Sequence, residues 1–474
     1  MVFSSTIFLL IFLPIFLITY YFAHDKYKNI VILVFSCLFY SWGAPKFLFV
    51  ILGSTFIDFH LVKWMDRSKT DLHRKIMLSI SVGINLGLLI YFKYSNFFID
   101  NLNAALSTFG YNEIAWAKLI LPIGISFYTF ETITYVFDVY RRVHKPLTNF
   151  WDYQTYIILF PKLIAGPIIR YHDLAGQITD RKENETIDNK LIGMYRFILG
   201  LSKKVLIANY MAGIADEIFA TEFNNLDSFS AWIGILAYTF QIYFDFSGYS
   251  DMAIGIGQMI GFKFPENFNN PYSSRSITEF WRRWHITLGS WMRNYLYIPL
   301  GGNRVDSKMR LYFNLWLVFL ASGLWHGASW NFIFWGAYHG LFLVLERVFL
   351  LRLYEKIPNI FRVGLTFLIV LIGWVFFRIE GFSEALQFLK TMFRFDLTSF
   401  YHINFKTYII FTLATIFGFF TVSKLGQKIQ DMVYFERYNN RKHLLFFTIC
   451  SVLFLISVGS IVRSDFNPFI YFRF

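Results

Sequence analysis

The chain has 474 residues, of which 56% are hydrophobic and 21% aromatic, whereas only 16% carry a charge. So little polar surface cannot solvate a globule of this length, which excludes a soluble protein. The formal net charge is +13, but the basic residues lie between apolar runs, where they set membrane topology. No nucleic-acid partner is therefore indicated. Because no polar block is long enough to form a soluble domain, we expect a single membrane domain over 1–474.

Apolar runs of about the 20 residues that a spanning helix needs recur along the whole chain. The first run has no basic n-region and no small-residue cleavage site, so we expect it to be retained as a span. The pattern predicts an all-α, polytopic integral membrane protein with about 11–12 transmembrane helices, plus re-entrant and interfacial helices. The candidate spans are 2–22, 30–42, 46–62, 76–92, 119–139, 205–219, 229–246, 311–325, 329–346, 363–377, 408–423 and 444–462.

Clusters of lysine and arginine at 26–28, 63–75 and 141–145 fall on one side when alternate spans are counted. That side should be cytoplasmic, so we expect both termini to be extracytoplasmic. The same count places the segments 170–204, 263–310, 347–362 and 424–442 in the cytoplasm. It places 94–118, 220–228, 379–407 and the C-terminus outside.

The middle of the chain is irregular. The apolar segment 159–170 is interrupted by Pro161, Gly166 and Pro167, so it cannot form one continuous spanning helix. Irregular backbone survives at membrane depth only where protein or a water-filled cavity covers it, which predicts a re-entrant segment. The segment 263–304 is rich in Trp, Arg, Tyr and Asn, as is typical of helices at the cytoplasmic interface.

His326 lies inside the hydrophobic stretch 321–340. Ionisable residues within membrane segments are expensive and usually face a cavity or a substrate path, so the residue is a candidate functional group. Neighbouring small residues allow helices to approach closely. The alternative is a histidine that hydrogen-bonds to a neighbouring helix, and we interpret His339 in that structural way first.

The stretch 280–304 combines His285 with arginines and aromatic residues. Guanidinium groups beside aromatic rings suit a cofactor that carries phosphates and adenine. The alternative is a basic amphipathic helix on anionic lipid headgroups. Asp245 and Asp251 end another apolar run, where they could orient an imidazole. An ion pair with Arg282 or Arg283 is the favoured interpretation.

No metal site is predicted. Cys37 and Cys450 lie in apolar runs, and no histidine pair has helical spacing with a third ligand nearby. The sequence also lacks a glycine-rich phosphate loop of the Walker type.

Several stretches together resemble the membrane-bound O-acyltransferase superfamily, specifically its bacterial branch with the alginate and peptidoglycan O-acetylation membrane subunits. Asn294 departs from the Asp that many relatives carry at this position, which puts a charged role there in doubt. The matching stretches are 121–130, 160–170, 240–251, 264–268, 281–288, 295–304 and 325–330.

The resemblance implies that His326 is the catalytic histidine and His285 its second, cytoplasmic-side histidine. It also implies a thin, funnel-like core, with acetyl-CoA as the acyl donor below and a secreted or membrane-anchored SGNH-like O-acetyltransferase as the partner above. The final acceptor would be a cell-envelope polysaccharide, either alginate-like exopolysaccharide or peptidoglycan. We expect Arg282, Arg283, Arg304 and the neighbouring Trp281 to hold the CoA phosphates and adenine.

The C-terminal segment 465–474 is unusually aromatic for a tail predicted outside the membrane. We expect it to enter the outer mouth of the tunnel and to present Tyr471, which by resemblance takes the acetyl group and passes it on. The alternative is a tail that anchors on the membrane surface. Two other functions compete with acetyl transfer. One is transfer of another acyl group, such as D-alanine, on the same fold, and the other is a polytopic transporter with His326 lining the path.

Overall fold

The computed structural model describes residues 1–396, 401–463 and 469–470, and the regular structure within them is helical, without strands. This confirms the all-α class. Among these residues, six helices are long and apolar enough to cross a membrane, as expected for a multi-pass membrane protein. The other predicted spans correspond to helices that are shorter or less apolar. The six are Pro45–Arg67, Asp71–Thr108, Trp330–Tyr354, Asn359–Arg378, Phe405–Val422 and Asn440–Arg463.

Contacts along the chain define two compact units, one made of 1–193 with 256–265 and the other of 194–255 with 266–474. The chain passes from one unit to the other within two of its helices and again between 265 and 266. In the first unit, where η marks a 3-10 or π segment, the elements are η1 (Phe8–Phe12), α1 (Leu13–Phe22), η2 (Asp25–Tyr27), α2 (Lys28–Ser41), α3 (Pro45–Arg67), α4 (Asp71–Thr108), α5 (Ile125–Tyr140), α6 (Phe150–Ile158), α7 (Phe160–Leu163), α8 (Tyr171–Thr179), η3 (Lys182–Asn184) and the start of α9 (Ile187–Ser202).

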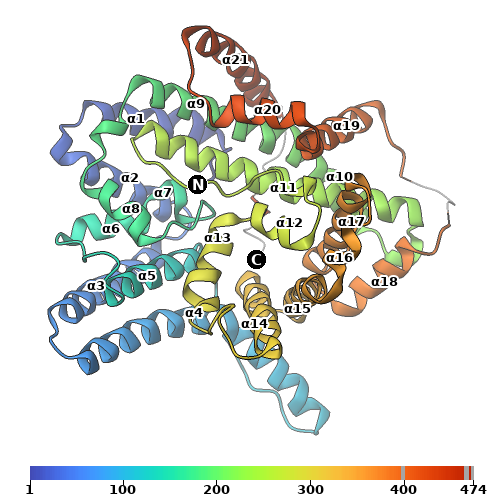
Figure 1. Ribbon diagram of the computed structural model, residues 1–474, viewed down its shortest axis with the longest axis horizontal. Helices are drawn as coiled ribbons and strands as arrows, with labels where there is room; N and C mark the ends of the chain where they lie inside the picture. Colours follow the sequence, from blue (N-terminus) through green and yellow to red (C-terminus); the bar gives the residue numbers. More distant parts are fainter. Residues whose placement is uncertain (397–400, 464–468, 471–474) are drawn as a thin grey trace. The chain divides into compact units, whose positions relative to one another are not determined.

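Helix α4 is longer than the apolar run that predicts it. It has 38 residues, or about 57 Å at 1.5 Å per residue, against a hydrocarbon thickness of about 30 Å. The predicted span 76–92 therefore ends too early, because the helix continues to Thr108. The following segment runs back along the helix (Figure 1). There the Trp116 indole donates to Asn96 Oδ1 over 3.0 Å, and the Ile114 N–H donates to Asn103 Oδ1 over 2.8 Å. These side-chain bonds support the polar end of α4.

The segment 159–170 is broken as its prolines and glycine predict. Helix α6 stops before Leu159, whose ψ of 104° is not helical, and α7 continues for only one turn. Gly166 is required there, because a Cβ atom would lie 2.4 Å from the Lys162 Cα. Residues 159–169 are buried throughout, and Lys162 forms a buried ion pair with Glu131 of α5. Protein therefore covers this irregular backbone, as a re-entrant segment requires.

The second unit begins within α9 and contains the stretches that carry the two candidate histidines. Its further elements are η4 (Lys203–Ala208), α10 (Asn209–Ala220), η5 (Phe223–Asn225), most of α11 (Ser228–Met259), η6 (Pro271–Ser273), α12 (Ile277–Arg283), α13 (Ile286–Met292), η7 (Arg293–Tyr297), α14 (Lys308–His326), α15 (Trp330–Leu345), η8 (Glu346–Leu350), α16 (Leu351–Tyr354), α17 (Asn359–Arg378), α18 (Phe382–Met392), α19 (Phe405–Phe419), η9 (Phe420–Val422), α20 (Lys424–Tyr434) and α21 (Asn440–Arg463).

Helices α14 and α15 pack side by side with their backbones in contact (Figure 1). A Cβ atom on Gly323 would lie 2.2 Å from the Phe332 carbonyl oxygen, and one on Gly336 would lie 2.4 Å from the Phe319 carbonyl oxygen. Only glycine allows so close an approach, which confirms the packing role predicted for the small residues here. This contact places His326, the last residue of α14, against the side chains of α15.

Candidate active site

His326 ends α14 inside an aromatic enclosure and is only 5% exposed. Its ring centroid lies 4.9 Å from that of Trp325, 5.2 Å from that of Trp335 on α15 and 5.2 Å from that of Phe377 on α17. All three contacts are edge-to-face, the favoured geometry for aromatic pairs. The imidazole is thus held in one orientation, away from bulk water.

His285 lies between α12 and α13 in a left-handed backbone conformation, with φ of 46°. A non-glycine residue there costs about 1–3 kcal/mol, a strain that concentrates at functional sites. The residue is 2% exposed and lies outside the six candidate spanning helices. Burial lowers the pKa of its imidazole to about 3, so the ring is neutral at pH 7.

The hydrogen bonds of His285 determine which ring nitrogen carries the proton. Its Nδ1 lies 3.0 Å from Asn267 Oδ1, and the backbone N–H of Thr287 also points to that oxygen, at 3.4 Å. Since a backbone N–H can only donate, this atom of Asn267 is the carbonyl oxygen, and Nδ1 of His285 must be the donor. The Nε2 atom therefore carries the lone pair. It is buried and has no hydrogen-bond partner among the described residues.

Trp325 connects the two histidines. Its ring centroid lies 5.9 Å from that of His285 and 4.9 Å from that of His326. The structure thus brings together two predicted residues that are separated by 41 positions in the chain.

Trp281, predicted to bind the cofactor, belongs to the aromatic wall behind His326. Its ring packs on Trp335 at 5.4 Å and on His339 at 5.0 Å. His339 is fully buried, and neither of its nitrogens has a hydrogen-bond partner within the described part of the chain. The predicted bond from His339 to a neighbouring helix is thus not seen.

The three predicted phosphate-binding arginines are arranged differently from one another. Arg282 and Arg304 are exposed, whereas Arg283 forms an ion pair of 2.7 Å with Glu279 one turn earlier in α12. Arg282 and Arg304 can therefore accept a phosphate directly, and Arg283 only by leaving its carboxylate.

The prediction that Asp245 or Asp251 pairs with Arg282 or Arg283 is wrong. Asp245 Oδ1 lies 2.9 Å from Lys204 Nζ, and Asp251 is bound by Arg196 and Lys203 at 2.9 and 2.6 Å. Helix α11 directs both carboxylates toward the α9–η4 segment instead of toward α12. The motif around the two acids was visible in the sequence, but nothing in it indicated their basic partners.

Two residues of the C-terminal segment, Phe469 and Ile470, are described and both are buried. The Phe469 ring lies 4.6 Å from that of Tyr249 and 6.0 Å from that of Phe246, both on α11. The Ile470 N–H donates to Asp245 Oδ2 over 2.9 Å. Tyr471 lies outside the described residues.

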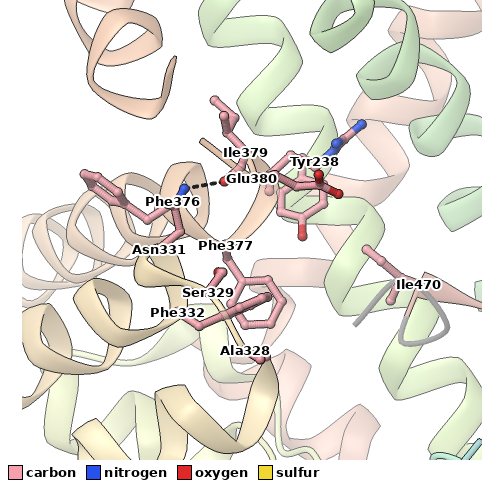
Figure 2. A pocket seen from close by; sticks show the side chains of 12 residues that line it. Tyr238, Ala328, Ser329, Asn331, Phe332, Phe376, Phe377, Ile379, Glu380 and Ile470 are labelled. Carbon is pink, nitrogen blue, oxygen red and sulfur yellow. Dashed lines mark hydrogen bonds between the residues drawn. The ribbon is translucent and has the colours of Figure 1, made fainter. Parts of the chain in front are cut away.

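A cavity of about 320 Å³ opens beside the end of α14. Figure 2 shows Asn331 and Ile470 on opposite sides of it, with Phe332 and Phe377 between them. Gly327, the residue after His326, also lines the cavity. The amide of Asn331 donates to the Ile379 carbonyl oxygen, and its own Oδ1 has no partner within the described residues.

The cavity also contains a guanidinium that the sequence did not single out. Arg378 forms an ion pair of 2.9 Å with Asp216 and lies 4.9 Å above the Phe219 ring. Its Nε is buried and has no hydrogen-bond partner among the described residues. The only signal in the sequence was a basic residue at the end of an apolar run, which equally indicates a membrane boundary. An apolar cavity with a few directed polar groups, next to a buried histidine, is the usual form of a substrate site.

Comparison with known proteins gives the class of protein that this fold and site define. The family model described as MBOAT, membrane-bound O-acyltransferase family, matches residues 140–382. The chain belongs to this family and is a multi-pass membrane acyltransferase.

The chain is also similar to individual named relatives over most of its length. It is 40% identical over 497 residues to the probable alginate O-acetylase AlgI of Pseudomonas putida, with all of both chains covered. It is 46% identical over 397 residues to the protein of the same name from Pseudomonas aeruginosa, covering 83% of this chain and 75% of that one. It is 35% identical over 438 residues to the peptidoglycan O-acetyltransferase of Helicobacter pylori, covering 85% and 82%.

Proposed function

We propose that this chain moves an acetyl group from cytoplasmic acetyl-CoA through the bacterial cell membrane, for O-acetylation of an extracytoplasmic polysaccharide. The observation that carries the proposal is the pair of buried histidines, His285 and His326, which both pack against the Trp325 ring. The names of the relatives support acetate as the group moved and an alginate-like polymer or peptidoglycan as the final acceptor.

Contacts between loops of the second unit support the predicted sidedness. Loops that the charge pattern places outside contact one another: Ser228 N–H donates to Asp396 over 2.9 Å, and Arg394 donates to the Leu226 carbonyl oxygen over 2.9 Å. Segments predicted to be cytoplasmic do the same. The pairs are Arg347 with Asn303 at 3.2 Å, Gln430 with Asn269 at 2.9 Å and Arg196 with Glu266 at 2.6 Å.

The donor would enter at the side of α12 and α13. Exposed Arg282 and Arg304 can bind phosphates there, and Arg283 can join them by exchanging Glu279 for a phosphate. The thioester end must then reach the aromatic interior. Because the Nε2 atom of His285 is unprotonated and buried, it suits a role as a hydrogen-bond acceptor along this path.

His326 would act as the general base at the acyl-transfer step. It removes the proton from the attacking hydroxyl as that oxygen forms a bond to the thioester carbonyl carbon. When the carbon–sulfur bond breaks, the proton passes to the departing thiolate, so that the products are an ester and free CoA thiol. Covalent transfer through the imidazole itself would give the same products in two steps.

The buried position of Phe469 and Ile470 supports the predicted role of the C-terminal segment. In this proposal the next residue, Tyr471, supplies the first hydroxyl, and its acetyl ester is then attacked by a serine of a separate extracytoplasmic transferase. A phenyl ester is a better leaving group than an alkyl ester, so the onward transfer is downhill. Deletion of 468–474 should abolish acetylation and leave the membrane domain folded; unchanged acetylation would refute the shuttle.

In this proposal the cavity beside Gly327 is where the acceptor of the acetyl group enters. Its lining groups Asn331 and Arg378 each keep a buried polar atom without a partner among the described residues. Such atoms favour a ligand that supplies hydrogen bonds. We assign them to orienting the incoming acceptor, whereas the donor binds at the α12 side.

Purified protein tests the proposal through the release of free thiol from acetyl-CoA. The parent should release CoA thiol, and His326→Ala should lower the rate by about 10²–10⁴-fold, the usual contribution of a general base. His339→Ala, a second buried histidine in the same enclosure, is the matched control and should retain turnover. Equal rates in the parent and His326→Ala would contradict the assignment.

The same assay separates acetate from D-alanine. A chain that takes D-alanine from a carrier protein would need a phosphopantetheinyl protein and would leave free acetyl-CoA intact.

A further inference from the structure

We infer that Asp245 is a positioning residue that holds the C-terminal segment in the second unit. The inference rests on the proposed function only where acetyl transfer is measured, because the seating of the segment can be tested without activity. The residues that carry it are Asp245, Lys204, Ile470, Phe469 and Tyr249.

The Asp245 carboxylate is only 1% exposed, and Lys204 is only 2% exposed. A buried carboxylate is tolerated when its charge is balanced and its lone pairs are occupied. Here the two oxygens have different partners: Oδ1 lies 2.9 Å from Lys204 Nζ, and Oδ2 accepts the Ile470 N–H over 2.9 Å. One carboxylate thus joins η4, α11 and the C-terminal segment.

The site that holds Phe469 and Ile470, which we call the seat, consists of Asp245, Lys204 and Tyr249. Tyr249 follows Asp245 by one helical turn of α11, so both face the same direction. Its ring packs on Phe469 at 4.6 Å, while the backbone of the next residue is bound by Asp245. The bond to a backbone N–H does not depend on the side chain at 470, whereas the ring contact selects an aromatic residue at 469. Together they define the direction and register of the segment.

The seat also connects the segment to both ends of the candidate active site. Phe246 contacts Phe469 at 6.0 Å and His285 at 4.8 Å. Ile470 lines the same cavity as Gly327, the residue after His326. Loss of the Asp245 bond should therefore release Phe469 and Ile470 from Phe246 and from the cavity without altering either histidine.

The first test measures the accessibility of the segment. Ile470→Cys in a background of Cys37→Ala and Cys450→Ala keeps the backbone N–H and provides one thiol for a small maleimide. An asparagine at 245 offers one acceptor oxygen and one donor amide, so either Lys204 or the Ile470 N–H then faces a donor. Asp245→Asn should raise the labelling rate by about tenfold or more, as expected for loss of a hydrogen bond to a charged group.

Asp251→Asn is the matched control. It removes a second buried carboxylate from the same helix, one bound by Arg196 and Lys203. Its labelling rate should equal that of the parent. Equal labelling of Asp245→Asn and the parent, or an equal rise in both variants, would overturn the inference.

Hydrogen exchange of the unaltered protein keeps the inference testable if an Asp245 variant does not fold. The Ile470 amide should exchange at least about a hundredfold more slowly than in a free peptide of residues 464–474, because its proton is bound to a buried carboxylate. Exchange at the rate of the free peptide would overturn the inference.

A measurement of acetyl transfer then shows whether the segment that Asp245 holds also carries the acetyl group. If the segment carries the acetyl group, Asp245→Asn should lower transfer in the full chain. Release of the segment without loss of transfer would leave the seat established and refute the shuttle.

Discussion

We predict that the buried, neutral imidazole of His285 makes the folded protein less stable in acid. The folded protein keeps this imidazole neutral because burial lowers its pKa to about 3, against 6.5 in a free side chain. Between these values the unfolded chain binds a proton that the folded chain does not, so stability is present above pH 6.5 and is lost as the pH falls. The loss should approach about 1.4 kcal/mol per pH unit.

His285→Asn isolates this contribution, because asparagine tolerates a positive φ and does not titrate. In detergent, the unfolding midpoint of the parent should fall more steeply between pH 6.5 and 5 than that of the variant. Parallel curves for the two proteins would show that His285 does not carry the acid sensitivity.

Substitution of Arg378 tests whether this residue acts on the acceptor or on the acyl donor. Arg378→Gln removes the charge that pairs with Asp216 but keeps a hydrogen-bonding side chain beside the cavity. We expect transfer to the acceptor to fall by about tenfold, while binding of acetyl-CoA, measured by calorimetry, remains unchanged. Weaker binding of acetyl-CoA would place the arginine on the donor side instead.

At the scale of elements, the contact between α14 and α15 leads to a prediction about packing. Gly336→Ala should lower the free energy of unfolding by about 1–3 kcal/mol, because the new methyl would meet the Phe319 carbonyl oxygen at 2.4 Å. Gly364→Ala in α17 is the control, since nothing lies within 4 Å of its added Cβ. Thermal unfolding in detergent should separate them, and equal midpoints would contradict the close approach.

Element boundaries were predictable where a local signal marks them. Pro161 and Gly166 break the backbone in the structure as their chemistry requires, and Gly323 lies at a close helix contact. The length of α4 was not predictable from hydropathy, because side-chain bonds from Asn96 and Asn103 support its polar end. Hydropathy could not predict this length, because it measures apolar surface and not side-chain hydrogen bonds.

The residues of the site were predictable only in part for the same reason. His326 stands out because ionisable groups are rare in apolar stretches, and His285 because it lies among arginines and aromatic residues. Their common neighbour Trp325 follows only from the packing of α14. The partner of Asp245 was assigned wrongly. A buried acid requires a base, but local sequence does not say which helix supplies it.

At the scale of the whole molecule, the charge pattern predicts the side on which each loop lies. Glu222 and Lys428 are both exposed, and they lie in segments predicted to be outside and cytoplasmic respectively. In cells with Cys37 and Cys450 replaced, a membrane-impermeant maleimide should label Glu222→Cys and leave Lys428→Cys unlabelled until the membrane is opened. The reverse pattern would invert the proposed direction of transfer.

The most direct test of the central claim is the alkali-releasable acetate on cell-envelope polysaccharide, compared between the parent, His326→Ala and a strain lacking the chain. Membrane levels of the variant must match those of the parent. The proposed function predicts that His326→Ala carries as little acetate as the deletion strain, and the polymer fraction that loses acetate identifies the acceptor. Acetate at the parental level in His326→Ala would make the buried histidine a packing residue and contradict the mechanism.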